Sequence, residues 1–284
     1  MSTRNDSRDS AAPDLRTARA FGESWNRIGT VYSREQFLEW FAPLGPEDFI
    51  GHDVLEMGFG NGSLLVHVAQ ESPSRLAGVE LADTGEQTRR NLARVTAAPV
   101  EIHRGDLTQV DLGQFDLVYC IGVLHHLSDP DAGFAAVLRH VKPGGRFHCW
   151  VYAREGNLGI RLTVEPIRRI VSRLPWWITK YAVALPLVTP YYILAKTLRL
   201  LRLDHARSIV RWIPLFEYTR WIAGEPFRFF HHVAFDQLVS PRTRYLERSR
   251  ILRWLSDPSI DHDTTYLILR NGNSWKFGGR KRDP

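Results

Sequence analysis

Ten residues, Asp53 to Gly62, constrain the fold of this chain more than any other stretch. Their first half is a short apolar run that carries one acid, Glu56, and their second half has glycine at alternate positions, at Gly58, Gly60 and Gly62. This pattern predicts a buried strand that runs into a turn with no room for side chains. Such a turn places backbone N–H groups against the polar end of a ligand. We therefore expect a ligand site where this strand ends.

Short apolar strands and amphipathic helices alternate between Asp53 and Tyr152. We expect strands over residues 54–57, 76–81, 100–103, 115–123 and 146–152, separated by helices over 62–70, 84–95 and 130–140. The fourth of these strands is almost continuously apolar, which is typical of a strand buried on both faces of a parallel sheet. The alternation predicts a doubly wound sheet, in which ligands bind at the carboxyl ends of the strands.

Residues 153–240 interrupt this alternation with many prolines and aromatic side chains, and we interpret them as an inserted helical subdomain that forms a substrate lid. Residues 241–284 return to the α/β pattern and are expected to complete the core. They contain a helix over 241–256, strands over 264–269 and 275–278, and the turn Asn271-Gly272-Asn273 between these strands. The expected fold class is α/β, with a mostly parallel sheet and an inserted helical lid.

The N-terminal part of the chain divides into a tail and a helical segment. Residues 1–20 are rich in Ser, Asp, Arg and Ala and are expected to be a disordered tail. Residues 21–152 hold the N-terminal helices and the core. Ser33 and Gln36 fit a capping box that starts a helix. We expect Phe21 and Trp25 to fill the core, and covering a ligand is the alternative role for both.

The net charge of +6 is unevenly distributed. Residues 1–150 have 14 Lys and Arg against 20 Asp and Glu, whereas residues 151–224 have 12 against 4. A basic surplus suits nucleic acid, an anionic membrane or an anionic substrate, and it is also compatible with a solvated face. The longest uncharged run, 181–195, has 15 residues. Spanning a bilayer takes about 18–20, so we expect no transmembrane helix, and peripheral membrane contact through 166–203 stays an open alternative.

The two cysteines indicate a reducing compartment. Cys120 and Cys149 lie in apolar runs and are expected to be reduced core residues. The chain has no apolar signal segment at its N-terminus, so a cytoplasmic location is expected, with membrane association as the alternative. No spacing of Cys, His and acidic residues indicates a metal site.

Side chains at three strand ends indicate which ligand the glycines hold. Ser63 stands where the dinucleotide pattern has its third glycine, and Glu56 suits a ligand with an ammonium group. Glu80 ends the second strand, where a carboxylate accepts hydrogen bonds from both hydroxyls of a ribose. Asp106 follows the third strand and suits an exocyclic amine such as that of adenine. Ammonium, ribose and adenine together describe S-adenosylmethionine.

The chain resembles class I S-adenosylmethionine-dependent methyltransferases with a methyltransferase type 11-like domain. The motifs that carry the resemblance lie at 54–62, 78–80, 105–107, 115–127 and 141–145. The resemblance implies a Rossmann-like sheet of seven strands and S-adenosylmethionine as the cofactor. Shorter flanking stretches, such as Phe21–Trp25 and Asn273–Trp275, resemble bacterial methyltransferases of surface-polysaccharide and natural-product clusters.

The resemblance also assigns roles to residues. It places Glu56 and Gly58 at the methionine end, Glu80 at the ribose, and Asp106 at the adenine. The full set of expected cofactor-binding residues is Glu56, Gly58, Phe59, Gly60, Gly62, Glu80, Leu81, Asp106, Leu107 and Ile121. The sequence departs from the family pattern at Glu56, where Asp is commoner, and at Phe59, where a small residue or Cys is common.

Methyl transfer to oxygen or nitrogen near neutral pH needs a base, and histidine suits this role. We take His125, His126, His231 and Tyr152 as the candidate catalytic residues, and His232, beside His231, could also reach the site. The expected acceptor is a small, partly apolar or anionic molecule, such as a natural-product, lipid-linked or saccharide intermediate. Transfer to oxygen is favoured over transfer to carbon or nitrogen.

Two other classes of function remain open from the sequence. One is a peripheral membrane or partner-binding protein that keeps the fold, although Glu56, Glu80 and Asp106 argue against it. The other is an RNA methyltransferase, which the basic surplus favours. Because no platform of aromatic residues interleaved with Lys or Arg is apparent, nucleic acid is not the expected partner. The sequence does not determine the oligomeric state.

Overall fold

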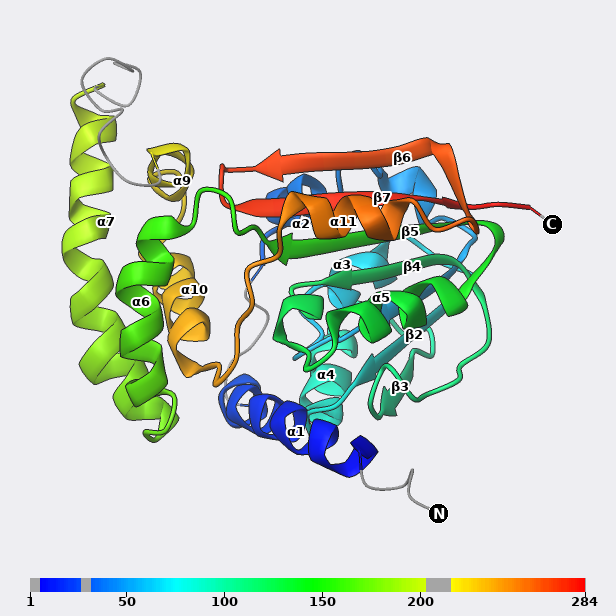
Figure 1. Ribbon diagram of the computed structural model, residues 1–284, viewed down its shortest axis with the longest axis horizontal. Helices are drawn as coiled ribbons and strands as arrows, with labels where there is room; N and C mark the ends of the chain where they lie inside the picture. Colours follow the sequence, from blue (N-terminus) through cyan, green and yellow to red (C-terminus); the bar gives the residue numbers. More distant parts are fainter. Residues whose placement is uncertain (1–5, 27–31, 203–215, 284) are drawn as a thin grey trace.

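A seven-stranded sheet crosses the molecule in the order β3-β2-β1-β4-β5-β7-β6 (Figure 1). The structure is a computed structural model that describes residues 6–26, 32–202 and 216–283. The strands are β1 Asp53–Met57, β2 Arg75–Glu80, β3 Glu101–Arg104, β4 Phe115–Ile121, β5 Val141–Tyr152, β6 Ile260–Arg270 and β7 Ser274–Lys281. Strands β1 to β5 are parallel, and β7 runs antiparallel between β5 and β6. The predicted α/β fold with a mostly parallel sheet of seven strands is confirmed.

Helices cover both faces of the sheet because neighbouring strand residues point to opposite sides. Val54 faces a cluster with α2 Arg34–Phe41, α3 Leu65–Gln70 and α4 Gly85–Leu92. Leu55 faces a second cluster with α5 Pro130–Arg139 and α11 Arg248–Leu255. Short helical turns η1 Pro46–Asp48 and η2 Leu124–His126 lie before β1 and after β4. The carboxyl ends of β1 and β4, where the strand order reverses, stay accessible for a ligand.

The N-terminal segment is helical, so the expectation of a disordered tail over residues 1–20 is wrong for its described part. Helix α1 runs over Asp6–Trp25. Long-range contacts that composition does not reveal hold it in place: the Asp14 carboxylate accepts from the Ser128 backbone N–H at 2.9 Å and pairs with Arg242 at 3.2 Å. The predicted capping box of Ser33 and Gln36 is present at the start of α2.

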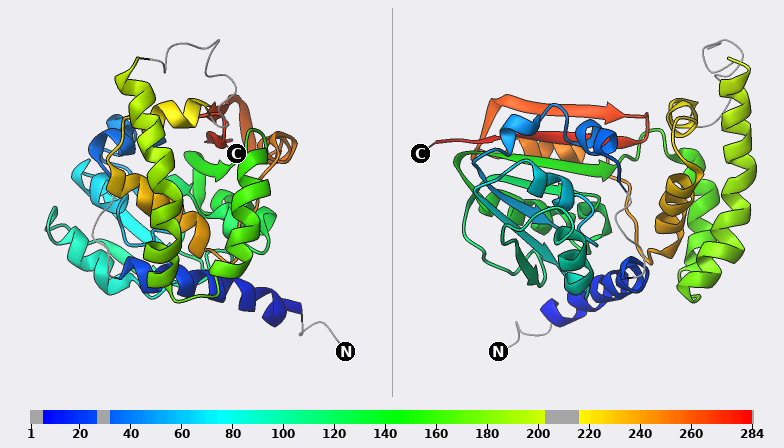
Figure 2. Two further views of the ribbon diagram at one scale, coloured as in Figure 1. Left: turned by 90° about the vertical axis from the view of Figure 1, so that its left-hand side faces the viewer. Right: turned by 180° about the vertical axis from the view of Figure 1, so that it is seen from behind.

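The helices α6 Leu158–Val171, η3 Ile178–Ala184, α7 Leu185–Leu200, α9 Phe216–Ile222 and α10 Phe227–Val239 lie beyond the carboxyl ends of the parallel strands (Figures 1 and 2). Helix α10 lies between the sheet and the outer helices α6 and α7. Of the helix predicted over 241–256, only Arg248–Leu255 is helical. The preceding residues are not helical, and one of them, Leu246, pairs with Ala153 beside the end of β5. The parts of the expected domains at residues 1–5, 27–31, 203–215 and 284 lie outside the described residues, and the division into domains stays a prediction.

One helix, Ile178–Leu200, is long and apolar enough to cross a membrane, judged by length and composition alone and within the described residues. Only 22 % of its most apolar window is buried. The sequence argument against a membrane span counted the uncharged run between Lys180 and Lys196. That argument does not hold, because the two lysines lie inside one uninterrupted helix rather than at its limits.

Candidate functional site

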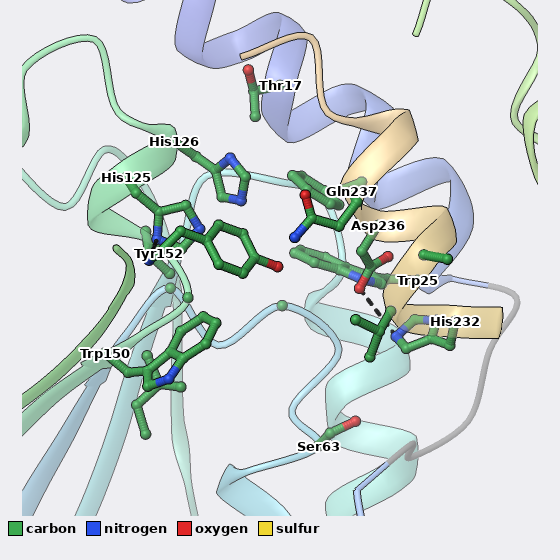
Figure 3. A pocket seen from close by; sticks show the side chains of 18 of the residues that line it. Thr17, Trp25, Ser63, His125, His126, Trp150, Tyr152, His232, Asp236 and Gln237 are labelled. Carbon is green, nitrogen blue, oxygen red and sulfur yellow. Dashed lines mark hydrogen bonds and ion pairs between the residues drawn. The ribbon is translucent and has the colours of Figure 1, made fainter. Parts of the chain in front are cut away.

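A cavity of about 560 Å³ lies at the carboxyl ends of the central strands, between the sheet, α1 and the insertion (Figure 3). Its volume is within the range of small-molecule sites, about 300–1,000 Å³. Nine of the ten predicted cofactor residues border it, namely Glu56, Gly58, Phe59, Gly60, Glu80, Leu81, Asp106, Leu107 and Ile121. The sheet therefore brings the strand-end residues into one site, as the sequence predicts.

The glycine turn adopts a backbone that side chains disfavour. Gly58, Gly60 and Gly62 have φ of +87°, +57° and +76°, in the left-handed region where glycine has no Cβ penalty. A Cβ at Gly58 would lie 2.3 Å from Val123, and a Cβ at Gly62 would lie 2.6 Å from Thr88. Gly62 is the one predicted cofactor residue that does not border the cavity, and it lets the turn pack on α4 instead.

The Glu80 carboxylate is held in place by the glycine turn. Its two oxygens accept hydrogen bonds from the backbone N–H groups of Gly60 at 3.0 Å and Ala82 at 2.8 Å. A carboxylate has about four lone-pair sites, so Glu80 keeps acceptor capacity for a ligand. This arrangement fits the two adjacent hydroxyls of a ribose.

Glu56 is a buried acid beside the turn. Burial raises its pKa to about 8, although the Tyr119 hydroxyl donates to it at 2.8 Å. The Glu56 side chain pairs with no described cation. A buried carboxyl in this position gains most from a ligand that carries a positive charge, which fits the ammonium end of S-adenosylmethionine.

The loop after β3 provides a third polar contact. Asp106 Oδ1 accepts from the backbone N–H of Thr108 at 2.8 Å and from its hydroxyl at 2.7 Å, and these bonds order the loop. Oδ2 is left for a donor such as the exocyclic amine of adenine. Leu107 is buried beside it and supplies apolar surface for a flat ring. The residues present thus fit the three polar parts of the cofactor.

Phe21 and Trp25 cover the glycine turn from α1. Their rings stack with centroids 4.8 Å apart, and the Trp25 ring lies 3.2 Å from the Cβ position of Gly60. Both side chains border the cavity, so they close the ligand site as well as filling core space. Thr17 borders the cavity one helical turn earlier and was not singled out from the sequence.

Two of the candidate histidines follow β4 and border the cavity with opposite tautomers. His125 Nδ1 accepts from the Tyr152 backbone N–H at 3.4 Å, so its Nε2 carries the proton and has no partner among the described residues. His126 Nδ1 donates to the Arg242 carbonyl at 2.7 Å, so its Nε2 has the lone pair. Burial lowers both pKa values, that of His126 to about 4. His125 Nε2 is therefore a buried donor without a partner among the described residues, and His126 is a weak base.

The candidate His231 does not border the cavity. Its Nε2 donates to the Lys180 carbonyl at 2.9 Å, and its ring stacks on Phe227. The next residue on α10, His232, borders the cavity instead, so of the two neighbouring histidines only His232 reaches the site.

Three polar residues of α10 meet Tyr152 in the cavity, and the sequence analysis gave no role to two of them, Asp236 and Gln237 (Figure 3). His232 Nε2 lies 3.2 Å from Asp236 Oδ2, and Gln237 follows. Each of the three side chains also has a buried polar atom with no hydrogen-bond partner among the described residues. These atoms are His232 Nδ1, Asp236 Oδ1 and Gln237 Oε1. Burial raises the pKa of Asp236 to about 8 and lowers that of His232 to about 3. The i, i+4 spacing of His and Asp was the available sequence signal.

The rest of the cavity is largely aromatic and apolar. It is bordered by Tyr32, Trp40, Trp150, Leu187, Val188, Tyr191, Tyr218, Trp221 and Phe230. Among the described residues that border it, five carry a carboxyl group and Arg270 alone is cationic. Arg270 already pairs with Glu39 at 2.9 Å and lies over the Trp221 ring. The cavity therefore has largely apolar walls, and its one cationic side chain among the described residues is already paired.

Comparisons with known proteins agree with this geometry. A family profile described as a methyltransferase domain matches residues 54–145. A ubiquinone biosynthesis O-methyltransferase of Neisseria meningitidis is 31% identical over 105 residues, covering 36% of this chain and 44% of the relative. A tRNA (guanine-N(7)-)-methyltransferase of Stenotrophomonas maltophilia is 33% identical over 146 residues, covering 46% of this chain and 58% of the relative. The chain thus spans about half the length of these two relatives.

A solved structure supports the fold over nearly the whole chain. Magnesium protoporphyrin IX methyltransferase of Synechocystis, solved with bound S-adenosylhomocysteine, covers 99% of this chain and 89% of its own, with a TM-score of 0.50 and 12% identity. The domain match, the strand order and the polar groups at the strand ends agree on one family and one cofactor, S-adenosylmethionine. The chain therefore carries, over residues 54–145, a methyltransferase domain whose site fits S-adenosylmethionine.

Proposed function

We propose that the chain transfers a methyl group from S-adenosylmethionine to a hydroxyl oxygen of a small, neutral and largely apolar molecule. The observation that carries this proposal is the polar group of His232, Asp236 and Gln237 in an otherwise apolar part of the cavity. Buried polar atoms without partners are costly, so this place suits the one polar group of an acceptor. The relatives named for ubiquinone biosynthesis support oxygen as the acceptor atom.

Bound S-adenosylmethionine supplies the electrophilic methyl group on a sulfonium. The protein's residues position the acceptor and exclude water. Asp236 lies where it can take the proton of the acceptor hydroxyl. The oxygen would then accept the methyl group that the bound cofactor would supply, with the sulfur of the cofactor as the leaving group. With a pKa of about 8, Asp236 is closer to neutral pH than His126 is and is the better matched base. The Tyr152 hydroxyl, which points toward Asp236 and Gln237, orients the acceptor.

A labelling experiment tests the proposed reaction. The full chain is incubated with S-adenosylmethionine carrying a tritiated methyl group and with three acceptor sets: alkyl-substituted phenols, the matching anilines, and bulk tRNA. We expect label in the phenols as methyl ethers, with rates that rise as the alkyl group fills more of the cavity. Label in tRNA or in the anilines, with none in the phenols, would overturn the proposal. If calorimetry showed no binding of S-adenosylhomocysteine, the enzymatic function itself would be excluded.

The proposed contact of Glu56 with the ammonium group predicts that cofactor affinity depends on pH. Because the pKa of Glu56 is about 8 in the free protein, the carboxyl is mostly protonated at neutral pH. A cationic ligand binds its charged form and releases the proton, so affinity rises with pH, by up to about tenfold per unit below the pKa. Calorimetry with S-adenosylhomocysteine between pH 6 and about 7.5 measures this dependence. The range lies below the usual pKa of α-amino groups, so titration of the ligand's own amino group contributes little.

The variant Glu56→Gln cannot titrate and is expected to flatten this dependence. Glu80 also has a pKa raised by burial and acts in the same direction, so part of the slope is expected to persist. Glu101→Gln, at an exposed residue of β3 away from the cavity, is the matched control and should keep the full slope. An affinity that falls as pH rises would contradict the placement of Glu56 at the ammonium group.

A further inference from the structure

The outer side of the insertion exposes an unusual amount of apolar surface. Of the seventeen large apolar side chains that are exposed in the described chain, eleven belong to α6, η3, α7 and the residues joined to them: Leu158, Leu162, Ile170, Leu174, Trp177, Tyr181, Leu187, Ile193, Leu194, Leu200 and Leu201. We call this set the α6–α7 face. In the left view of Figure 2, α6 and α7 stand in front of the sheet, with α10 behind them. Exposed apolar side chains gathered on neighbouring helices in this number are typical of an interaction site.

The α6–α7 face is distinct from the side of these helices that holds the insertion together. Val171, Ala184, Val188 and Ala195 are buried in clusters that include side chains of α10. Each outer helix therefore has a buried side toward α10 and a second apolar side toward solvent. Exposed fractions of 60 % for Ile193 and 83 % for Leu200 show that packing inside the chain does not account for this second side.

The charges around the α6–α7 face indicate what covers it. Residues 158–202 hold eight Lys and Arg and one acid, Glu165. Arg169 and Arg173 are exposed near the end of α6, and Lys196, Arg199 and Arg202 are exposed near the end of α7. Because the two helices run antiparallel (Figure 1), the cations lie at opposite ends of the apolar face. Apolar side chains flanked by Lys and Arg are typical of helices that lie in the interface of an anionic bilayer.

We infer that the α6–α7 face binds the surface of an anionic lipid membrane, with α6 and α7 lying in the plane of the bilayer. A second copy of the chain is disfavoured, because the same cationic ends would meet across the contact. Crossing of the bilayer by Ile178–Leu200 is disfavoured, because Thr179, Ala184, Val188 and Ala195 are buried in the insertion and would have to leave it. This inference goes beyond the proposed methyl transfer and does not depend on it.

The cavity reaches the same two helices. Ile160 and Val164 of α6 and Leu187 and Val188 of α7 border it. Leu187 belongs to both the cavity wall and the α6–α7 face. We call the part of the cavity lined by α10 the acceptor half. One layer of helices thus separates the proposed bilayer from this acceptor half, which gives an apolar molecule dissolved in the membrane a short route to the site.

Vesicle flotation with the full chain tests the inference. The probes are vesicles of phosphatidylcholine alone and vesicles with equal parts of phosphatidylcholine and phosphatidylglycerol. We expect binding to the anionic vesicles and release by high salt. The double variant Ile193→Glu with Leu200→Glu is expected to weaken binding about tenfold or more, because two apolar side chains no longer enter the interface. The matched control, Ile50→Glu with Leu269→Glu, changes two exposed apolar residues outside the face and should bind as the wild type does.

Three outcomes would overturn the inference. They are an absence of binding to anionic vesicles, equal binding by the Ile193 and Leu200 variant, and retention in the membrane after alkaline carbonate, which indicates a chain that crosses the bilayer. Conversion of a dimer to a monomer by the same variant, without vesicle binding, would assign the face to self-association. Calorimetry with S-adenosylhomocysteine in the same samples reports folding and the cofactor site separately, so failure of membrane binding is distinguishable from failure of the proposed enzyme.

Discussion

The variant Gly60→Arg is expected to bind S-adenosylhomocysteine at least about a hundredfold more weakly than the wild type does. Gly60 has φ of +57° and borders the cavity, and a Cβ there would lie 3.2 Å from the Trp25 ring. An arginine side chain at this point must occupy the cofactor volume or displace Trp25. It also disturbs the N–H group that donates to Glu80 at 3.0 Å. Isothermal titration calorimetry measures the loss directly.

Gly113→Arg is the matched control for this variant. Gly113 also has positive φ, +79°, but it is exposed, has open space at its Cβ position and does not border the cavity. A non-glycine residue in this conformation costs about 1–2 kcal/mol, so both variants should lose a similar amount of stability in thermal unfolding. Only Gly60→Arg should lose binding. Binding within threefold of the wild type in Gly60→Arg would refute the assignment of the cofactor site.

Turnover of a hydroxyl acceptor is expected to fall about 10²–10⁴-fold in Asp236→Asn, the usual contribution of a general base. Affinity for S-adenosylhomocysteine should stay unchanged, because Asp236 belongs to the acceptor half of the cavity. In the wild type, kcat should rise with pH, because the pKa of Asp236 is about 8 and the base acts only after losing its proton. The asparagine variant cannot titrate, so its residual rate should lack this rise. Stopped-time assays from pH 6 to 9 measure both effects.

Two further variants separate the possible bases. His126→Gln is expected to lower turnover by less than about tenfold, because a base with a pKa of about 4 contributes little near neutral pH. Asp263→Asn, at an exposed position of β6, makes the same chemical change away from the cavity and should have no effect. A larger loss in His126→Gln than in Asp236→Asn would make His126 the base and refute the role of Asp236.

Local patterns were sufficient to predict which strand-end residues border the cavity. The apolar run, the glycines and the acid Glu56 are contiguous, and the parallel sheet brings other strand ends, such as Glu80 and Asp106, to the same edge. Each of these residues follows from the strand that precedes it, without knowledge of distant packing. Nine of the ten predicted residues border the cavity for this reason, and the exception, Gly62, is explained by its contact with Thr88.

The residues that line the acceptor half of the cavity could not be predicted in this way, because their positions depend on contacts between segments far apart in the sequence. Helix α1 reads as polar and unstructured by composition, and its position depends on the pairing of Asp14 with Arg242, 228 residues away. On α10, the choice between His231 and His232 requires the rotation of the helix relative to a cavity that the helix itself completes. The sequence argument against a membrane-spanning helix failed for a different reason. A charged residue ends an uncharged run of sequence, but it does not end a helix.

The two ends of the insertion leave the core at a single point. The backbone N–H of Arg154 donates to the Leu246 carbonyl at 2.9 Å, and the N–H of Leu246 donates to the Tyr152 carbonyl at 2.9 Å. Residues 155–245 therefore form one insertion that leaves the core and returns to it beside the carboxyl end of β5. A different helical segment can therefore replace residues 155–245 during evolution. It can join the core at the same two attachment residues without shifting the register of any strand. The proposed acceptor contacts and the proposed membrane face both lie within residues 155–245, so they can evolve together while the strand-end residues of the sheet stay constant.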